Sequence, residues 1–487
     1  MKIILIQPPI SGSPEALSES LVEPLGLAYI AGFLEEKGYF VRILDCPAEG
    51  IEGEGIREYL RKIEPDIVGI SCMFSAYYQD SLYVAEIVKK EFPKTLVVLG
   101  GVHATVFPES LLRNTCVDIV VMGEGEGTFL EIVKKVETGS SLKEIPGTAI
   151  RIDGKIIKNP SSPLIEDLDT LPFPARHLLP IKKYFSFQKK GVGTYKYYLR
   201  NPLSPLITSR GCPFNCSFCA VPNFWKRIYR THTPERVISE IEALLRDYKI
   251  REIAFWDDNI SLDRERFIKL CTLIKERKFN LSWQTPNGIS TLNLDYSLLN
   301  LMKESGYYRA TFAIESGSVQ TLKKYVDKPI DFKKVKELIK ICHYLGIWTY
   351  GIFIIGFPDE KLNQIEETKR MVKSLGFDFV AIFIAQPYPG TRLFEIFKEK
   401  GLIPGNDYPQ GSSMVFSKFD TLYFSHRKLW KIQQDIYFEF ILSKFFSFLK
   451  MNSFVFLFKK INSWEKFRYF LRLLGNILKR KWFGRKV

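Results

Sequence analysis

Three closely spaced cysteines are the residues of this chain whose types and spacing point most directly to chemistry. Cys212, Cys216 and Cys219 lie in the string RGCPFNCSFCAVP, with the spacing Cys-x3-Cys-x2-Cys. Three thiolates can hold three irons of a [4Fe–4S] cube, which leaves the fourth iron without a protein ligand. An iron with an open position binds and activates a small molecule. The triplet therefore predicts a catalytic iron–sulfur site.

Two simpler interpretations of the triplet stay open at this point. A structural zinc site usually has four ligands in two pairs, and here the nearest spare candidate is His232, with no second Cys-x2-Cys pair in the chain. The thiols could also be ordinary core residues, although chance rarely produces this spacing. The other five cysteines are isolated in or beside apolar runs, and we expect small buried side chains there: Cys46, Cys72, Cys116, Cys271 and Cys342.

The elements that must position the cysteines alternate between strands and helices from Pro205 to about Lys400. Six strands, each followed by a helical pattern, predict a partial (β/α)6 barrel with its chemistry at the C-terminal ends of the strands. The first strand ends directly at the cysteine triplet. The six predicted strands are Pro205–Ser209, Glu252–Trp256, Leu281–Gln284, Arg309–Ile314, Trp348–Ile355 and Phe379–Ala385.

Acidic residues follow two of these strands. Asp257 and Asp258 end the second strand, where each could accept hydrogen bonds from a bound ligand; the alternative is that Asp258 or Ser261 caps the next helix. Glu315 follows the apolar fourth strand, and its burial without a partner would be costly. We therefore expect Glu315 to contact a bound ligand.

The first 140 residues show a second strand–helix alternation, which predicts a doubly wound, Rossmann-like parallel sheet with helices on both faces. Ligands of such sheets bind at the carboxyl ends of the strands. The first strand is followed by Gln7-Pro8-Pro9-Ile10 and not by Gly-x-Gly, which argues against NAD or FAD. The predicted strands are Ile3–Ile6, Val41–Leu44, Ile67–Ile70, Leu96–Leu99 and Asp118–Val121, with helices such as Leu25–Lys37 and Ser81–Glu91 between them.

These motifs together resemble the radical S-adenosylmethionine (SAM) superfamily, in the subfamily with a cobalamin (B12)-binding domain. The cysteine loop, with Phe218 before the last cysteine, resembles the cluster loop of that family. The stretches PLGLAYIAGFLEEKGY, GGVHAT and VMGEGEGTFLE resemble its cobalamin-binding domain, and DLDTLPFPARHLLP resembles its connector. The resemblance implies a [4Fe–4S] cluster, SAM and cobalamin as cofactors, and an electron donor such as flavodoxin or ferredoxin.

The resemblance also implies site residues in both domains. Those expected to bind SAM are Phe218, Trp256, Asp257, Asp258, Asn287, Glu315, Ser316, Ile355 and Gly356. Those expected to bind cobalamin are Pro9, Asp45, Pro47, Ser71, Gly100, Gly101, His103, Gly123, Glu124 and Gly125.

The segment after the second strand departs from the pattern of cobalamin domains that supply a histidine to cobalt. Their motif is Asp-x-His-x-x-Gly, whereas this chain has Asp45-Cys46-Pro47-Ala48-Glu49-Gly50. Pro47 cannot ligate cobalt, so either the lower face of cobalt is free or water-bound, or the domain is purely structural. His103 is the only histidine in this region, and we expect it in a turn against the cofactor or nearby backbone.

Length and composition set the domain organisation. The 487 residues are too many for one ordinary core. We expect a cobalamin-binding-like domain at 1–145, a hairpin at Asp153-Gly154 and a linker within 146–202, a barrel at 203–400, and a helical C-terminal region at 401–487. No secretory signal or uncharged run long enough to span a bilayer is recognised, and cluster-type cysteines indicate a reducing cytoplasm.

The basic character of the chain is concentrated in its C-terminal tail. The net charge is +15, and Thr421–Val487 contributes 15 Lys and Arg against three acids. The tail interleaves aromatic and basic residues at helical spacing. Its helices could pack on the barrel, lie in an anionic membrane interface or, less favoured, bind nucleic acid. The membrane interpretation predicts that deleting Ser463–Val487 abolishes vesicle binding.

These observations predict an enzyme that cleaves SAM reductively to a 5′-deoxyadenosyl radical. With cobalamin, the outcome would be methylation, rearrangement or cyclisation at an unactivated carbon. We expect a hydrophobic or natural-product substrate, lipid-like or tetrapyrrole in kind. The alternatives are a cobalamin-free radical SAM oxidoreductase and a cobalamin or iron–sulfur sensor or carrier.

Overall fold

The computed structural model describes residues 1–11, 21–73, 75–192, 197–403, 417–448 and 459–483. Within these ranges the chain forms two compact units, one built mainly from Met1–Phe187 and the other beginning at Gln188. Parts of the aromatic tail, residues 449–458 and 484–487, lie outside the described residues. In unit 2, His426–Phe448 and Trp464–Phe483 form the helices α18 and α20.

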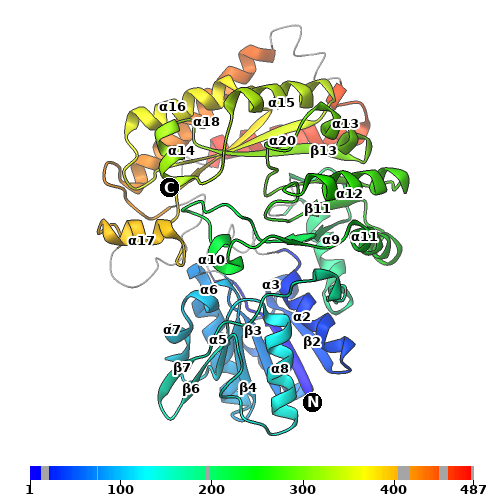
Figure 1. The fold of residues 1–487 in the computed structure, drawn as a ribbon, viewed down its shortest axis with the longest axis vertical. Coiled ribbons are helices and arrows are strands. Elements are labelled where there is room, and N and C mark those ends of the chain that lie inside the picture. Colours follow the sequence, from blue (N-terminus) through cyan, green and yellow to red (C-terminus); the bar gives the residue numbers. More distant parts are fainter. Residues whose placement is uncertain (12–20, 74, 193–196, 404–416, 449–458, 484–487) are drawn as a thin grey trace. The chain divides into compact units, whose positions relative to one another are not determined.

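Unit 1 contains the predicted parallel sheet (Figure 1). Its strand order is β2-β1-β3-β4-β5-β6-β7, in which the first five strands pair in parallel. The last two pair antiparallel as the predicted hairpin around Asp153-Gly154. The strands are β1 (Lys2–Gln7), β2 (Phe40–Asp45), β3 (Ile67–Ser71), β4 (Leu96–Gly100), β5 (Ile119–Val121), β6 (Thr148–Ile152) and β7 (Lys155–Lys158).

Helices cover this sheet and enclose an apolar core of Ile, Leu and Val side chains. The helices are α2 (Leu25–Glu36), α3 (Cys46–Glu49), α4 (Glu54–Ile63), α5 (Tyr78–Glu91), α6 (Val102–Val106), α7 (Pro108–Leu112) and α8 (Gly125–Glu137). The proline-rich connector after the hairpin forms only short turns, η2 (Leu168–Thr170) and η3 (Arg176–Leu178), before α9 (Ile181–Lys190). Arg176 anchors it through a buried ion pair with Glu23, 3.2 Å between Nε and Oε2.

Unit 2 contains the predicted six-stranded parallel sheet, in the order β15-β14-β13-β12-β11-β8. Its strands are β8 (Leu203–Leu206), β11 (Glu252–Phe255), β12 (Ser282–Gln284), β13 (Tyr307–Glu315), β14 (Trp348–Ile355) and β15 (Phe379–Ile384). The helices are α10 (Val221–Trp225), α11 (Pro234–Tyr248), α12 (Arg264–Glu276), α13 (Tyr296–Glu304), α14 (Val319–Tyr325), α15 (Phe332–Tyr344), α16 (Leu362–Ser374) and α17 (Arg392–Glu399).

The predicted first strand of the barrel is wrong at its end. β8 stops at Leu206, and Ser209–Arg210 forms a separate short strand, β9. β9 pairs antiparallel with β10 (Arg230–Thr231), so the segment that carries the three cysteines starts and ends at one short ladder. The pairing of β9 with β10 thus closes the base of the cysteine loop.

The C-terminal helices pack on the barrel, which supports the structural interpretation of the tail. Tyr469 and Leu473 of α20 are buried against Tyr308 and Trp348, which lie at the N-terminal ends of β13 and β14. The deletion of Ser463–Val487 would therefore remove part of the core and does not test membrane binding alone. Among the described helices, none combines the length and the hydropathy needed to cross a bilayer.

Candidate functional site

The three cysteines lie between β9 and α10, where short backbone hydrogen bonds hold the loop. Cys216 is buried, and Cys212 and Cys219 are partly exposed. The backbone N–H of Cys219 donates to the carbonyl of Cys216 at 3.1 Å. The N–H and hydroxyl of Ser217 both donate to the carbonyl of Tyr325, at 2.9 and 3.0 Å. The loop therefore has a defined shape that is tied to the end of α14.

Gly211 fixes the start of the loop. Its φ is +94°, in the left-handed region, and a Cβ at this position would lie 2.1 Å from the carbonyl oxygen of Ile228. Its N–H donates to Oδ2 of Asp258 at 3.0 Å. The two sides of the loop approach here more closely than any side chain allows, so glycine is required.

Asp257 and Asp258 have different surroundings. Oδ1 of Asp257 accepts hydrogen bonds from the N–H and hydroxyl of Thr208, at 3.0 and 2.7 Å, and from the hydroxyl of Ser209 at 2.6 Å. Burial raises the pKa of Asp257, and these hydrogen bonds oppose that rise. Asp257 thus shapes the chain ahead of the cysteines, while Asp258 is the exposed carboxylate of the two.

The capping alternative for these residues is wrong. The residue that caps α12 is Asp263, whose side chain accepts a hydrogen bond from the N–H of Arg266. A hydrogen bond from the next strand end, and not a helix cap, holds the end of β11. The Asn287 amide donates to the carbonyl of the partly exposed Trp256 at 3.0 Å, which joins the ends of β11 and β12.

Glu315 is buried at the end of β13 and has a partner that sequence reasoning missed. Nζ of Lys328 lies 2.6 Å from Oε1 of Glu315. The neighbouring Ser316 is fully buried and shares a hydrogen bond of 3.0 Å with the hydroxyl of Thr368. The lysine follows α14 by a few residues, and only the fold brings it back to the strand end. The carboxylate does not need a ligand to balance its charge.

The end of β14 is packed closely. The Ile355 side chain is fully buried by other parts of the protein. Its contact with a ligand stays a prediction. The N–H of Gly356 donates to Oε2 of Glu360 at 2.6 Å, and burial raises the pKa of Glu360 to about 7. Phe218 of the cysteine loop lies 6.2 Å, between ring centroids, from Phe357 of this segment.

The three thiols must lose their protons before they can bind a metal. Burial raises the pKa of Cys216 to about 11 and of Cys219 to about 12, and it also raises that of Cys212. Metals bind thiolates and displace these protons. Within the described ranges, no three His, Cys, Asp or Glu side chains surround a single ion position. In a cube each thiolate binds a different iron, so three cysteines spread along one loop fit that group.

In unit 1 the carboxyl ends of β3, β4 and β5 are tied together. The N–H of Cys72, next to Ser71, donates to the carbonyl of Gly100 at 2.6 Å. Gly101 has φ +117°, and a Cβ there would lie 2.8 Å from the carbonyl oxygen of Cys72. The Thr105 hydroxyl donates to Gly101 O at 2.9 Å and accepts from the N–H of Gly123 at 3.0 Å. These contacts bring three strand ends into close backbone contact.

His103 is a buried histidine with one ring nitrogen that lacks a partner. Its Nδ1 lies 2.8 Å from the hydroxyl of Ser75, and its ring stacks on Tyr78 with centroids 4.8 Å apart. Nε2 has no hydrogen-bond partner among the described residues. Burial lowers the pKa of His103 to about 4, so the ring is neutral near pH 7. A buried ring nitrogen without a protein partner is a polar atom that a bound ligand or a water could satisfy.

The segment after β2 forms the short helix α3, which is closed by hydrogen bonds. The Asp45 side chain accepts from the N–H of Ala48 at 3.1 Å and from the hydroxyl of Tyr184. Burial raises the pKa of Asp45 to about 7. Pro47 is buried in the first turn of α3 and offers no ligand atom.

The remaining predicted cobalamin residues of unit 1 also lie at strand ends. Pro9 follows β1 and is buried, and Gly125 begins α8. The Glu124 carboxylate accepts a hydrogen bond of 2.7 Å from the N–H of Ile165 in the connector. Their contact with a cofactor stays a prediction.

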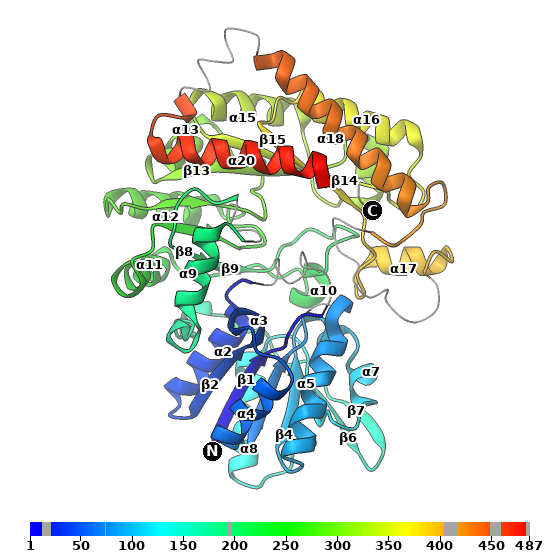
Figure 2. The same cartoon turned by 180° about the vertical axis from the view of Figure 1, so that it is seen from behind.

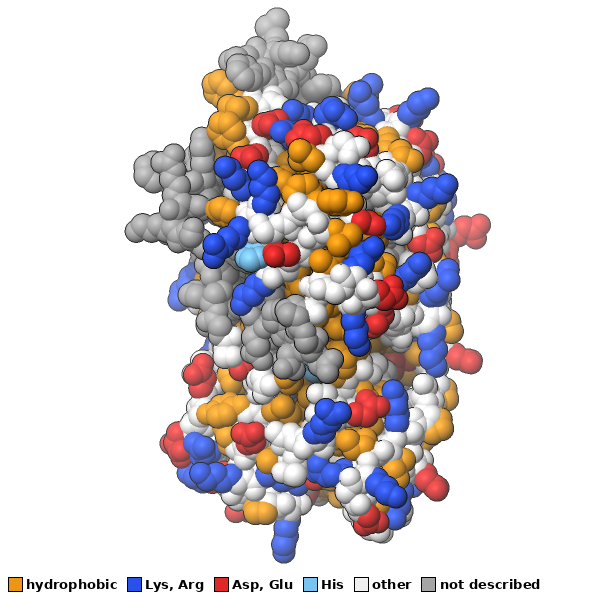
Figure 3. Space-filling view, turned by 90° about the vertical axis from the view of Figure 1, so that its left-hand side faces the viewer, with side chains coloured by type: hydrophobic (Ala, Val, Ile, Leu, Met, Phe, Trp, Pro, Cys, Tyr) orange, Lys and Arg blue, Asp and Glu red, His pale blue; other side chains and the backbone are white. Residues whose placement is uncertain are grey.

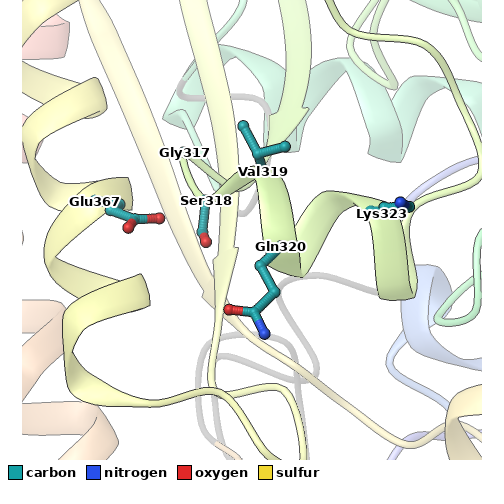
Figure 4. Close-up of a pocket in the computed structure, with 6 residues that line it drawn as sticks. All are labelled: Gly317, Ser318, Val319, Gln320, Lys323 and Glu367. Carbon is teal, nitrogen blue, oxygen red and sulfur yellow. The ribbon is translucent and has the colours of Figure 1, made fainter.

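A hollow of about 590 Å³ opens beside the end of β13 (Figure 4). It is lined by the start of α14 and by one residue of α16: Gly317, Ser318, Val319, Gln320, Lys323 and Glu367. None of the predicted site residues lines it. The hollow is therefore separate from the cysteine loop.

Two family models match this chain. Residues 16–133 match the B12 binding domain, and residues 206–372 match the Radical SAM superfamily. The first covers the strands β2 to β5 of unit 1, and the second covers the cysteine loop and the strands β11 to β14. The predicted order of the two domains is thereby confirmed.

Curated relatives match most of the chain. An uncharacterized methyltransferase of Pyrococcus horikoshii is 38% identical over 81% of this chain and 83% of its own length. Cytidylyl-2-hydroxyethylphosphonate methyltransferase of Streptomyces wedmorensis is 33% identical over 78% of each. Anaerobic magnesium-protoporphyrin IX monomethyl ester cyclase of Rubrivivax gelatinosus is 29% identical over 82% of this chain and 70% of its own.

Solved structures share the fold. The radical SAM methyltransferase TsrM from Kitasatospora setae, with cobalamin and a [4Fe–4S] cluster bound, gives a TM-score of 0.67 at 18% identity, over 82% of this chain and 75% of that one. The cobalamin-dependent radical enzyme OxsB, with aqua-cobalamin and SAM bound, gives 0.69 at 16% identity, over 98% and 71%. At these identities the likeness concerns the fold alone.

Proposed function

This chain belongs to the radical SAM superfamily, among the members that carry a B12-binding domain, and we propose that it methylates, rearranges or cyclises a small molecule at an unactivated carbon. The relatives are named methyltransferases and cyclases, so the chain is an enzyme and not a sensor or carrier. When bound, the cluster and SAM supply a radical that removes hydrogen, and cobalamin supplies a methyl carrier.

The observation that carries the proposal is the closed loop of Cys212, Cys216 and Cys219 at the end of the first barrel strand. We assign these thiolates to three irons of the cluster. The loop begins at Gly211, which is held by Asp258, and its middle is bonded to the end of α14 through Ser217. The backbone hydrogen bonds, and not the metal alone, therefore determine the positions of the three thiolates.

The carboxylate and ammonium of the Glu315–Lys328 pair offer opposite charges 2.6 Å apart at the end of β13. An amino acid group carries the complementary two charges, so this pair suits the methionine part of SAM. The exposed Asp258 offers a further acceptor. The other residues that we assign to SAM are Phe218, Trp256, Asn287, Ser316, Ile355 and Gly356, while the contacts of Asp257 indicate a positioning role.

The proposal that unit 1 binds cobalamin at these strand ends is supported by His103, whose Nε2 is buried without a partner. Gly101 supports it indirectly, because its missing Cβ lets the ends of β3 and β4 lie close together. Pro47 removes the usual histidine ligand, so cobalt would have no protein ligand from this segment. We assign the strand-end residues of unit 1 to contacts around the cofactor.

Replacing His103 by leucine should weaken the binding of hydroxocobalamin. A single hydrogen bond is worth about 0.5–1.5 kcal/mol, so the dissociation constant should rise up to about tenfold. An absorbance titration of the purified protein measures this constant without any turnover. His177→Leu is the control, because His177 is exposed and pairs with Glu35 elsewhere in unit 1. Equal affinities for His103→Leu and wild type would remove the assignment.

For the substrate we propose a hydrophobic molecule, lipid-like or tetrapyrrole in kind. The cyclase relative is named for a magnesium-protoporphyrin ester, which supports this class. We also propose flavodoxin or ferredoxin as the electron donor to the cluster. Cys212 and Cys219 are partly exposed, so a docked electron carrier or a small reductant can approach the cysteine loop.

Anaerobic incubation with SAM and a reductant tests the proposed function. The reconstituted protein should form 5′-deoxyadenosine, and label from the SAM methyl group should appear in product when substrate is present. A corrinoid absorbance spectrum separates this function from the cobalamin-free radical oxidoreductase. A fully loaded protein that forms no 5′-deoxyadenosine would contradict the proposal.

A further inference from the structure

The outward face of α20 is apolar although the helix is already packed through its opposite face. Tyr469 and Leu473 point inward and are 1% and 5% exposed. On the other side Trp464, Phe467 and Leu471 are 69%, 36% and 49% exposed. Their spacing, i, i+3 and i+7, places them in one stripe along the helix. Packing on the barrel does not explain these outward residues.

A second exposed aromatic group lies where the chain enters α20. Tyr344, at the end of α15, is 58% exposed, and Nζ of Lys459 lies 4.4 Å from the centre of its ring. The backbone of Lys459 packs on Gly346, where a Cβ would lie 2.9 Å from the Lys459 carbonyl oxygen. This contact fixes the lysine beside the tyrosine. An aromatic ring and a cation are thus held together next to the helix.

The charge around α20 is positive and is not balanced by acids on the helix. Glu465 is the acid of its first turn, and it pairs with Arg200 at 2.9 Å and Arg251 at 2.6 Å. Arg468 is exposed within the apolar stripe. On the face seen in Figure 3, by contrast, side chains of both signs are interspersed. The surroundings of α20 therefore attract anions.

Two partly buried lysines lie on the barrel side of the helix and add positive charge behind its outward face. Lys303 of α13 and Lys466 of α20 lie close enough to affect each other, and burial together with Lys466 lowers the pKa of Lys303 to about 8. Nζ of Lys303 lies 3.3 Å from the carbonyl of Gly346, which places the pair beside Lys459. The exposed cations Lys459 and Arg468 beside an apolar, aromatic stripe form a pattern suited to a charged boundary between water and hydrocarbon.

We propose that the outward face of α20, with Tyr344 and Lys459 at its start, docks on the surface of an anionic phospholipid bilayer. Trp464, Phe467 and Leu471 would enter the boundary between headgroups and acyl chains, while Lys459 and Arg468 bind the headgroup phosphates. Figure 2 shows α20 running across the near side of unit 2, in front of its strands. Docking on a bilayer would give α20 a function in addition to its packing on the barrel.

The alternative partner, nucleic acid, fits this surface less well. Proteins that bind single strands stack bases on aromatic rings in a basic groove. The stripe of α20 is the convex face of a helix, and Leu471 offers no ring for stacking. An aliphatic residue in the same stripe as an indole and an arginine suits hydrocarbon better than a base. Binding to a fluorescently labelled single-stranded DNA, measured by anisotropy, without binding to vesicles would contradict this choice.

Sedimentation with vesicles tests the proposal and needs neither cluster nor cobalamin. The full chain should pellet with vesicles of phosphatidylcholine containing phosphatidylserine, less with phosphatidylcholine alone, and less as salt is added. K459Q/R468Q should weaken binding by about fivefold for each cation removed, or about 30-fold in total. W464A/F467A should also weaken vesicle binding relative to wild type, because this variant loses exposed apolar area.

Matched variants separate docking from unspecific effects. K155Q/K158Q removes two exposed lysines from β7 in unit 1, and I157S removes an exposed apolar residue there. Both should pellet like wild type, and all variants should retain the wild-type melting temperature. The proposal is overturned if K459Q/R468Q pellets as well as wild type, if wild type does not pellet with anionic vesicles, or if it binds only single-stranded DNA.

Discussion

Replacing Cys216 with alanine should abolish the formation of 5′-deoxyadenosine from SAM in a protein that still folds. Cys216 is the middle thiol of the triplet and is 9% exposed. With two thiolates left, a second iron of the cube loses its protein ligand, and we expect little iron to remain after anaerobic reconstitution. Turnover should fall to background. Iron and acid-labile sulfide per chain, together with 5′-deoxyadenosine measured by chromatography, check both parts of this result.

The control for Cys216→Ala is Cys116→Ala. Cys116 is a partly buried, isolated thiol in unit 1, far in sequence from the triplet. Its loss should leave iron content and 5′-deoxyadenosine formation as in wild type. If Cys216→Ala kept both the full iron content and the activity, the assignment of this loop to the cluster would be wrong. A single bound zinc in wild-type protein would have the same consequence.

The two sheets could be predicted from the sequence because each strand is a short apolar run between helical patterns. Trp348–Ile355 is a strand over its whole predicted range, and the Asp153-Gly154 hairpin forms as expected. These features are local. The apolar pattern that marks a strand is the same pattern that buries its side chains in the core.

The end of the first barrel strand could not be predicted because it depends on a distant pairing. Ser209–Arg210 looks like a continuation of β8, but it leaves the sheet to pair with Arg230–Thr231. No periodicity marks that pairing in advance. The closed shape of the cysteine loop therefore became visible only in three dimensions.

The partners of buried charges were also beyond the sequence. Glu315 could be recognised as an acid that needs a partner, but Lys328 lies in a loop beyond the next helix. The sequence predicts Asp258 or Ser261 as the cap of α12, whereas Asp263 takes that position because it directly precedes the first helical residue, Arg264. Similarly, α20 is apolar on two faces, so its sequence pattern could not say which face meets the barrel.

Replacing Gly211 with alanine should impair the assembly of the cluster without removing any ligand. The new Cβ would lie 2.1 Å from the carbonyl oxygen of Ile228, and φ of +94° is unfavourable for alanine. The left-handed conformation costs about 1–2 kcal/mol, and forced displacement of packed groups costs typically about 1–3 kcal/mol. The base of the loop must open to relieve this contact. Iron content after reconstitution should then fall severalfold, and 5′-deoxyadenosine formation should fall with it.

Gly376→Ala separates the two contributions to this effect, because the glycines share a backbone conformation but not a neighbour. Gly376 also lies in unit 2 and has φ of +90°, and its nearest atom to a new Cβ is 4.0 Å away, on Ile339. Gly376→Ala should lower the free energy of unfolding by about 1–2 kcal/mol, the cost of the conformation alone. Its iron content should remain that of wild type. Equal iron loss in both variants would mean that general destabilisation, and not the shape of the cysteine loop, governs cluster assembly.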